Sequence, residues 1–330
     1  MSNRSSPSDA LYACRTYADY LHYFDALIEF YKGQGDVAPE FPTHASDREP
    51  KVMERVESCL LNAWSSEYAL AGMTMMSASH TGEDGGHYLP FLAHWAAIQS
   101  YYAIYGCARA LLLVLNGNEP RNHTKTWDIL MSTLVSGMRQ PVPRPWCLAV
   151  GSNSEPISFP QGFQPQSASN ITGDWHVRFE ELDIESCFQG YYRWLRKARE
   201  KEIFDVCRPF RRRLRKGRQQ QMDTQWKPTT VFVALRRLRE RCCYEDALMF
   251  MCAESDGILE AYGRSLRRIT YSTLEWMEQS IRSNIGGRAF DMIIGRFDLA
   301  ATQEHTLAQT GGVLRRWKTT SSIGEGTYEG

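Results

Sequence analysis

The sequence predicts a mainly α-helical protein, built as an antiparallel helical bundle with an irregular central insertion. Three observations lead to this prediction. Several long stretches carry apolar residues at helical spacing, and glycines or asparagines follow directly after some of them. Apolar residues make up 43% of the 330 residues and aromatic residues 12%, which is enough to bury a substantial core without disulfides or metals.

The N-terminal half contains four expected helices. Residues 9–32 alternate apolar and polar positions at helical spacing, and Gly33 follows as a stop. Ser46, with Glu49 three residues later, has the spacing of a capping box, so we expect a second helix to start there and to run toward Ser79.

A third helix is expected over the apolar residues 89–115, with Asn116 and Gly117 after it, and a short fourth one over 124–135. The third stretch is long enough to cross a membrane. Its polar residues, such as His94 and Arg109, would be costly there, so we interpret it as a buried core helix and expect no membrane span.

The middle of the chain is rich in proline, glycine and serine, which excludes regular helix over residues 137–174 but leaves room for short strands at 147–150 and 175–179. Helix is expected to resume near residue 183. We therefore divide the chain into an N-terminal half (1–136), an insertion (137–182) and a C-terminal half (183–330) that packs with the first half as one core.

Two long periodic helices are expected in the C-terminal half, over about 231–253 and 256–285. Thr229 or Thr230 is a suitable cap for the first. Gly286 and Gly287 separate the second from a last helix.

Composition indicates a reducing compartment and gives no global attraction to nucleic acid. Basic and acidic residues are equal in number, 38 each. The nine cysteines form no CxxC pair and lie mostly in helix-like stretches, so we expect reduced core thiols, a cytoplasmic protein, and neither a metal site nor a cofactor. The polar start of the chain lacks the pattern of an export signal.

One segment is strongly basic. Residues 193–218 hold twelve basic and three acidic residues, a net charge of +9, with aromatic residues interleaved. Arginine, which predominates, suits bidentate contacts with phosphate, so RNA or DNA is one candidate ligand and an acidic protein partner is the other. The candidate nucleic-acid-binding residues are Arg193, Arg196, Lys197, Arg208, Arg211, Arg212, Arg213, Arg215 and Lys216.

Common catalytic motifs are absent from the sequence. There is no HExxH, GxSxG, GxxxxGK or GxGxxG pattern, which removes the usual support for hydrolase, nucleotide triphosphatase and dehydrogenase activities. His80, His87 and His94 recur every seven residues, but intervening glycines interrupt any helix that would place them on one face.

Two separated segments carry a family resemblance. The first is the tyrosine- and alanine-rich stretch 101–112, followed by a glycine turn and then by Arg121, Asn122 and His123. The second is the stretch from Leu235 to Phe250. Together they resemble the HEPN-like helical superfamily, and YaaC-like proteins in particular, over about residues 55–135 and 228–290.

The resemblance implies a homodimer and a role in RNA binding or cleavage, for instance in a defence or toxin-related system. Active members use an RxxxxH pattern from two subunits, in which arginine binds phosphate and histidine assists attack by a 2′-hydroxyl without a metal. Here Arg239 is followed at that spacing by Tyr244, a poorer base at neutral pH. The candidate catalytic residues are therefore His123, Arg121, Arg239 and Tyr244.

Three hypotheses follow from the sequence. The first is a HEPN-like component that binds nucleic acid or a partner protein and lacks the usual catalytic pair. The second is a metal-independent ribonuclease with an atypical site, and the third is a helical scaffold that binds an acidic protein. Salt-dependent binding of nucleic acid separates the first two from the third, because phosphate contacts weaken steeply as salt rises.

Overall fold

The computed structural model describes residues 7–35, 49–79, 89–117, 120, 122–131, 146, 230–245, 250, 256–302 and 317. Over these residues the protein is mainly α-helical and contains no strand, which confirms the predicted fold class at this coarse level. The helices are α1 (Pro7–Gly33), α2 (Pro50–Ser79), α3 (Leu89–Asn116), α4 (His123–Met131), α8 (Val231–Glu240), α9 (Asp256–Ile285) and α10 (Gly287–Thr302), and a π-helical turn, η5 (Arg241–Glu245), follows α8.

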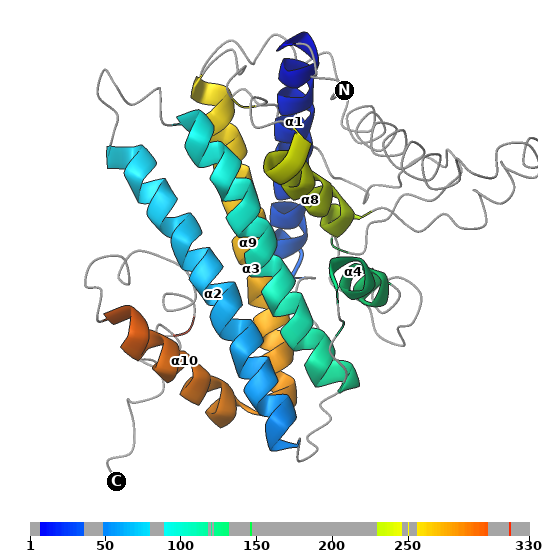
Figure 1. Cartoon of the computed structure of the whole chain (residues 1–330), viewed down its shortest axis with the longest axis vertical. Helices are drawn as coiled ribbons and strands as arrows, with labels where there is room; N and C mark the ends of the chain where they lie inside the picture. Colours follow the sequence, from blue (N-terminus) through cyan, green and yellow to red (C-terminus); the bar gives the residue numbers. More distant parts are fainter. Residues whose placement is uncertain are drawn as a thin grey trace, which may run out of the picture.

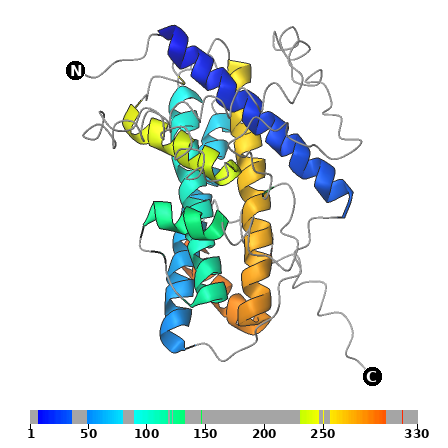
Figure 2. The same cartoon turned by 90° about the vertical axis from the view of Figure 1, so that its right-hand side faces the viewer.

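Three long helices, α2, α3 and α9, lie side by side (Figures 1 and 2). Helix α1 crosses α9, α10 turns back from the end of α9 toward α2, and α4 and α8 both lie on one side of α3. Helices α2 and α3 are antiparallel, whereas α9 runs in the same direction as α3. The expectation of an antiparallel bundle is therefore wrong for this pair, because a long connection, unlike a short loop, leaves the direction of the next helix open.

Helix α3 is the most buried element of the core. Its residues Leu92–Asn116 are long and apolar enough to span a membrane, and 72% of that window is buried inside the protein. Helices α2 and α9 cover two of its sides, and α4 and α8 contact it as well. Helices from both halves of the chain thus contribute to one hydrophobic cluster, which includes Leu60, Leu111 and Ile269.

The close approach of α2 to α3 depends on a glycine. A Cβ atom at Gly106 would lie 3.0 Å from the Cβ of Ala63, 3.0 Å from the carbonyl oxygen of Cys59 and 3.1 Å from the amide nitrogen of Ala63. Two of these three neighbours are backbone atoms of α2, so they cannot rotate away. The two helices can therefore pack this closely only with glycine at position 106.

A buried carboxylate links three parts of the core. Glu278 on α9 is fully buried, and its two oxygens accept hydrogen bonds from the indole nitrogens of Trp64 and Trp317, each at 2.8 Å. Trp317 also packs edge-on against Phe290 at 5.3 Å between ring centroids. Because a buried carboxylate needs such donors, these bonds hold Trp317 against α9 and α10.

Most predicted helix ends agree with the structure. The expected helix over 256–285 is confirmed as α9, and the glycines after α3 and α9 adopt the positive φ angles that end helices, 69° at Gly117 and 86° at Gly286. The short fourth helix begins at His123, one residue earlier than expected. Thr230 is the N-cap of α8, although its side chain makes no capping hydrogen bond.

The predicted start of the second helix at Ser46 is wrong. Helix α2 begins at Pro50, and the carbonyl of Glu49 accepts the first hydrogen bonds, from the amides of Val52 (2.9 Å) and Met53 (3.3 Å). Proline suits the first helical position and disfavours helical geometry in the residue before it. Glu49 is therefore the last residue outside the helix.

The helix expected over 231–253 is interrupted. Helix α8 ends at Glu240, and residues 241–245 form a π-helical turn. Arg241 and Cys242 in this turn are both buried, and π-helical geometry in proteins occurs mostly as such single turns within or beside α-helices. Cys242, like Cys59, Cys107 and Cys243, is a thiol and not part of a disulfide.

Several predictions fall outside the described residues. These are the helix expected from residue 183, the strands at 147–150 and 175–179, and the domain boundaries at 136/137 and 182/183. Trp146 is described and is buried, and its indole donates to Thr273 Oγ1 at 2.8 Å.

Replacement of Gly106 by alanine should destabilise the protein. The added methyl group has no room between α2 and α3, and overpacking of this kind costs about 1–3 kcal/mol. The control is Gly263→Ala in α9, where nothing lies within 4 Å of the new Cβ and a gain of about 0.5–1 kcal/mol is expected. Urea denaturation measures both; equal effects of the two changes would contradict the packing described here.

Candidate functional site

Three tyrosines on α3 form one side of the candidate site. Tyr101 and Tyr105 lie one turn apart, and their buried rings stack with centroids 5.8 Å apart and an interplanar angle of 7°. The ring of Tyr102 is partly exposed and meets Tyr101 edge-on at 5.5 Å. This face of α3 therefore presents aromatic rings and phenolic hydroxyl groups toward α4 and α8.

Helix α4 contributes His123 and Trp127, again one turn apart. The imidazole of His123 stacks on the ring of Tyr105, with centroids 4.1 Å apart and an angle of 27°. Asn122 fixes the start of the helix, because its side-chain oxygen accepts from the amide of Lys125 at 2.9 Å. His123 is thus held in the first turn of α4, against α3.

A chain of two hydrogen bonds joins α4 to α3. The indole nitrogen of Trp127 donates to the hydroxyl of Tyr101 at 2.9 Å, and this hydroxyl lies 2.8 Å from Nδ1 of His123. Burial raises the pKa of Tyr101, with smaller opposing effects from the Trp127 hydrogen bond and nearby arginines. The phenol therefore stays protonated at neutral pH.

Helix α8 is held to this cluster at two places. The guanidinium group of Arg239 donates a hydrogen bond to the hydroxyl of Tyr102 and lies over the rings of Tyr102 and Tyr101, 5.2 and 5.6 Å from their centroids. Near the start of α8, Phe232 stacks on Trp127 at 5.2 Å and 16°. We call this cluster the relay site: Tyr101, Tyr102, Tyr105, His123, Trp127 and Arg239.

The electrostatic environment of His123 is positive. Burial lowers the pKa of His123 below its ordinary value, and the charge of Arg239 lowers it further. Arg236 and Arg109 act in the same direction, and Glu240 opposes them. The partly exposed imidazole is therefore neutral at pH 7 and lies in a field that attracts anions.

The structure brings together two of the four candidate catalytic residues, His123 and Arg239, within one chain. Tyr244 lies in the π-helical turn, and its side chain is outside what the structure describes. Arg121 also lies outside the described residues, as do all the basic residues of the segment 193–218.

Sequence reasoning missed most of the residues that surround His123. Tyr101 and Tyr102 carried the resemblance but were not assigned to the site, and Trp127 was not singled out. The available signal was spacing, since Tyr101 and Tyr105, like His123 and Trp127, are four residues apart on their helices. Arg236 precedes Arg239 by three residues, which likewise places the two on one helix face.

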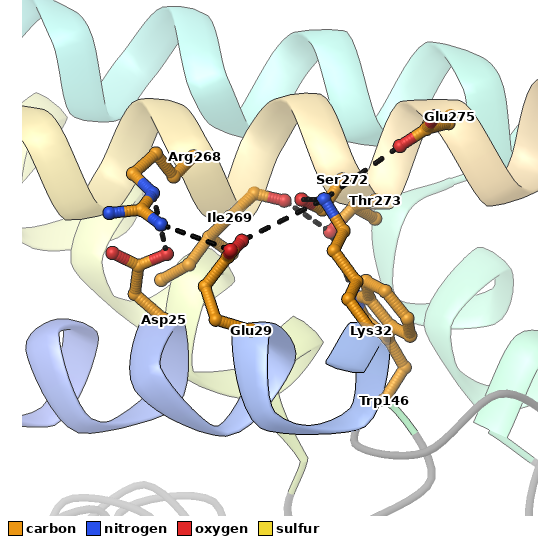
Figure 3. Close-up of polar contacts among 9 residues, drawn as sticks. All are labelled: Asp25, Glu29, Lys32, Trp146, Arg268, Ile269, Ser272, Thr273 and Glu275. Atoms are coloured by element: carbon orange, nitrogen blue, oxygen red, sulfur yellow. Dashed lines mark hydrogen bonds and ion pairs between the residues drawn. The ribbon is translucent and has the colours of Figure 1, made fainter. Parts of the chain in front are cut away.

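A second polar cluster joins α1 to α9 (Figure 3). Arg268 on α9 pairs with two carboxylates of α1, through Nε to Asp25 Oδ1 and through Nη2 to Glu29 Oε2, both at 3.3 Å. Lys32 completes the cluster by donating to Ser272 Oγ at 2.8 Å. Its amino group also lies 3.8 Å from a carboxylate oxygen of Glu29 and 3.8 Å from one of Glu275.

Asp25 is the buried member of this second cluster. Burial raises its pKa to about 7, and this effect outweighs the attraction of Arg268, whose side chain is 48% exposed. The cluster contains no imidazole or thiol, and among the described residues no group of three His, Cys, Asp or Glu side chains could hold a metal ion. We therefore interpret it as a contact that positions α1.

Comparisons of this chain with protein-family models, with curated proteins and with solved structures find no match.

Replacement of Asp25 by asparagine should change how stability depends on pH. The pKa of Asp25 is about 7 in the folded protein and 3.8 when unperturbed, so the folded state holds the proton more tightly. The contribution of the Asp25 carboxyl group to the free energy of unfolding is fully present below about pH 4. It is lost as pH rises toward 7, by up to about 1.4 kcal/mol per pH unit. Asp25→Asn should therefore gain stability over the wild type as pH rises from 4 to 8.

The measurement is urea denaturation of both proteins across this pH range. Glu275→Gln is the matched control, because Glu275 also belongs to the second cluster but is 45% exposed. The difference between this control and the wild type should stay nearly constant with pH. A constant difference for Asp25→Asn as well would show that Asp25 is not buried as described.

Proposed function

We propose that this chain is a HEPN-like helical protein that binds single-stranded nucleic acid, RNA in the first place, through phosphate contacts at the relay site, and that it lacks the usual catalytic pair. A homodimer and a role in a defence or toxin-related system are part of this proposal. They rest on the resemblance of residues 101–123 and 235–250 alone.

The observation that carries the proposal is the group of positively charged arginine side chains around His123. The guanidinium groups of Arg239 and Arg109 lie over the rings of Tyr102 and Tyr105, which contact the partly exposed imidazole. With Arg236 they lower the pKa of His123, and among the described residues Glu240 acts in the opposite direction. A phosphodiester is a small anion that accepts hydrogen bonds from both guanidinium and imidazole groups. The basic segment 193–218 would supply further phosphate contacts along the same strand.

The relay site is better suited to binding phosphate than to stacking bases. Tyr101, Tyr105 and Trp127 are buried, with 1%, 9% and 3% of their surface exposed, so their faces are already covered by one another and by His123. Among the tyrosine and tryptophan rings of the relay site, only that of Tyr102 is partly exposed. Sequence preference at this site should therefore be weak.

Fluorescence anisotropy with labelled oligouridylate and oligothymidylate, over a range of KCl concentrations, tests the proposal. We expect binding that weakens as salt rises, and Arg236→Gln should lower the slope of log K against log salt by about 0.7, the value for one phosphate contact on a single strand. The matched control is Arg296→Gln on α10, because Arg236 and Arg296 each form an ion pair, with Glu240 at 2.8 Å and with Glu57 at 2.6 Å respectively.

Two results would contradict the proposal. Absence of binding at low salt would favour the scaffold hypothesis, in which the basic segment meets an acidic protein. Cleavage of the oligouridylate in excess chelator, lost on His123→Ala, would replace binding by the ribonuclease hypothesis.

A further inference from the structure

The hydrogen bonds of the relay site determine which nitrogen of His123 carries the proton. An indole N–H can only donate, so the hydroxyl oxygen of Tyr101 accepts from Trp127. Among the residues that the structure describes, the other contact of this hydroxyl is with Nδ1 of His123, at 2.8 Å. The direction of that second bond depends on where the hydroxyl proton of Tyr101 points.

Only one direction satisfies every buried group. If Nδ1 carried a hydrogen, Nδ1 would donate to the hydroxyl oxygen of Tyr101, as the indole nitrogen of Trp127 already does. Both described contacts of the hydroxyl would then be donors, and its own proton would have no acceptor between them. A buried hydroxyl without an acceptor loses its hydrogen bond to water and gains none in return, so this direction is unfavourable. If the Tyr101 hydroxyl donates to Nδ1 instead, all three groups are satisfied, and the neutral imidazole carries its hydrogen on Nε2.

We infer that Trp127 and Tyr101 are positioning residues that fix His123 as a hydrogen-bond donor through Nε2, and that the ligand of the relay site is a phosphate oxyanion bound by this N–H together with Arg239. The inference rests on the proposed function and names the atom that meets the ligand. The same oxyanion is found in an internal phosphodiester and in a terminal phosphate.

The charge and the geometry of the relay site both favour a phosphate oxyanion as its ligand. The Tyr101 hydroxyl contacts Nδ1 at 2.8 Å and so leaves Nε2, the other ring nitrogen, for a ligand. The ring stacks on that of Tyr105, with centroids 4.1 Å apart. The guanidinium group of Arg239 is fixed nearby by Tyr102, whose ring lies 6.1 Å from that of His123. An anion that accepts from both groups would reduce the positive charge that depresses the pKa of His123.

The same arrangement opposes general base catalysis by His123. A base must offer an unprotonated nitrogen to the proton that it takes up, and here Nδ1 already accepts a hydrogen bond from Tyr101 while Nε2 carries hydrogen. The relay therefore makes the imidazole a binding group, in agreement with the absence of a histidine at position 244.

Long-range ¹H–¹⁵N correlation spectra of the full chain with ¹⁵N-labelled histidine test the first half of the inference. At pH 7.5 the His123 ring, assigned by its loss in His123→Asn, should show the pattern of the Nε2–H tautomer. Tyr101→Phe should remove this preference, whereas Tyr105→Phe should keep it, since that change preserves the stacked ring and leaves the relay intact. An Nδ1–H tautomer in the wild type would overturn the inference, whatever the protein binds.

Titration of the same sample tests the ligand, with inorganic phosphate and with 5′-hydroxyl and 5′-phosphorylated oligouridylate as probes. A shift of His123 Nε2 with the 5′-hydroxyl oligomer supports an internal phosphodiester, and a shift only with the other two probes supports a terminal phosphate. Binding seen by anisotropy without any shift at Nε2 overturns the inference and leaves the proposed function standing. The expected tautomer without binding of any probe overturns the proposed function and, with it, the assignment of the ligand.

Discussion

The burial of α3 between α2 and α9 is the constraint on which the rest of the structure depends. Because α3 is apolar on most of its surface, it is stabilised only where other helices cover it and exclude water. Gly106 allows α2 to approach on one side, and α9 covers another. The face that remains carries Tyr101, Tyr102 and Tyr105, and there α4 and α8 bind.

This arrangement explains why the polar groups of the relay site lie in fixed positions. Tyr101 and Trp127 are buried, so their polar atoms need hydrogen-bond partners. The indole nitrogen of Trp127 and the hydroxyl of Tyr101 bond to each other. His123 then completes the chain at its partly exposed end. A buried hydrogen-bond chain that has only one fully satisfied pattern can determine the proton position of a residue at its edge.

Much of the helical framework could be predicted from the sequence, because helix ends are local features. The glycines after α3 and α9 take the left-handed conformation that their position predicted. The start of α2 was wrong because Pro50 outweighs the capping-box spacing of Ser46 and Glu49. The π-helical turn after α8 was missed because a single turn of five residues is too short to change the apolar periodicity of the sequence around it.

The site was less predictable than the fold, since it depends on contacts between distant residues. His123 and Arg239 entered as candidates through a resemblance, but the residues that orient them did not. The hydrogen bond from Arg239 to Tyr102 spans 137 positions of the chain, and no local pattern indicates such a pairing. The direction of α9 relative to α3 was unpredictable for the same reason, because a long connection separates the two helices.

The most direct test of the central claim, that α8 places Arg239 against the tyrosines of α3, is a double-mutant cycle on the free energy of unfolding. The four proteins are the wild type, Arg239→Gln, Tyr102→Phe and the double variant. A contact of the kind seen here predicts a coupling energy of at least about 0.5 kcal/mol. Additive effects of the two substitutions would contradict the docking of α8, and with it the relay site.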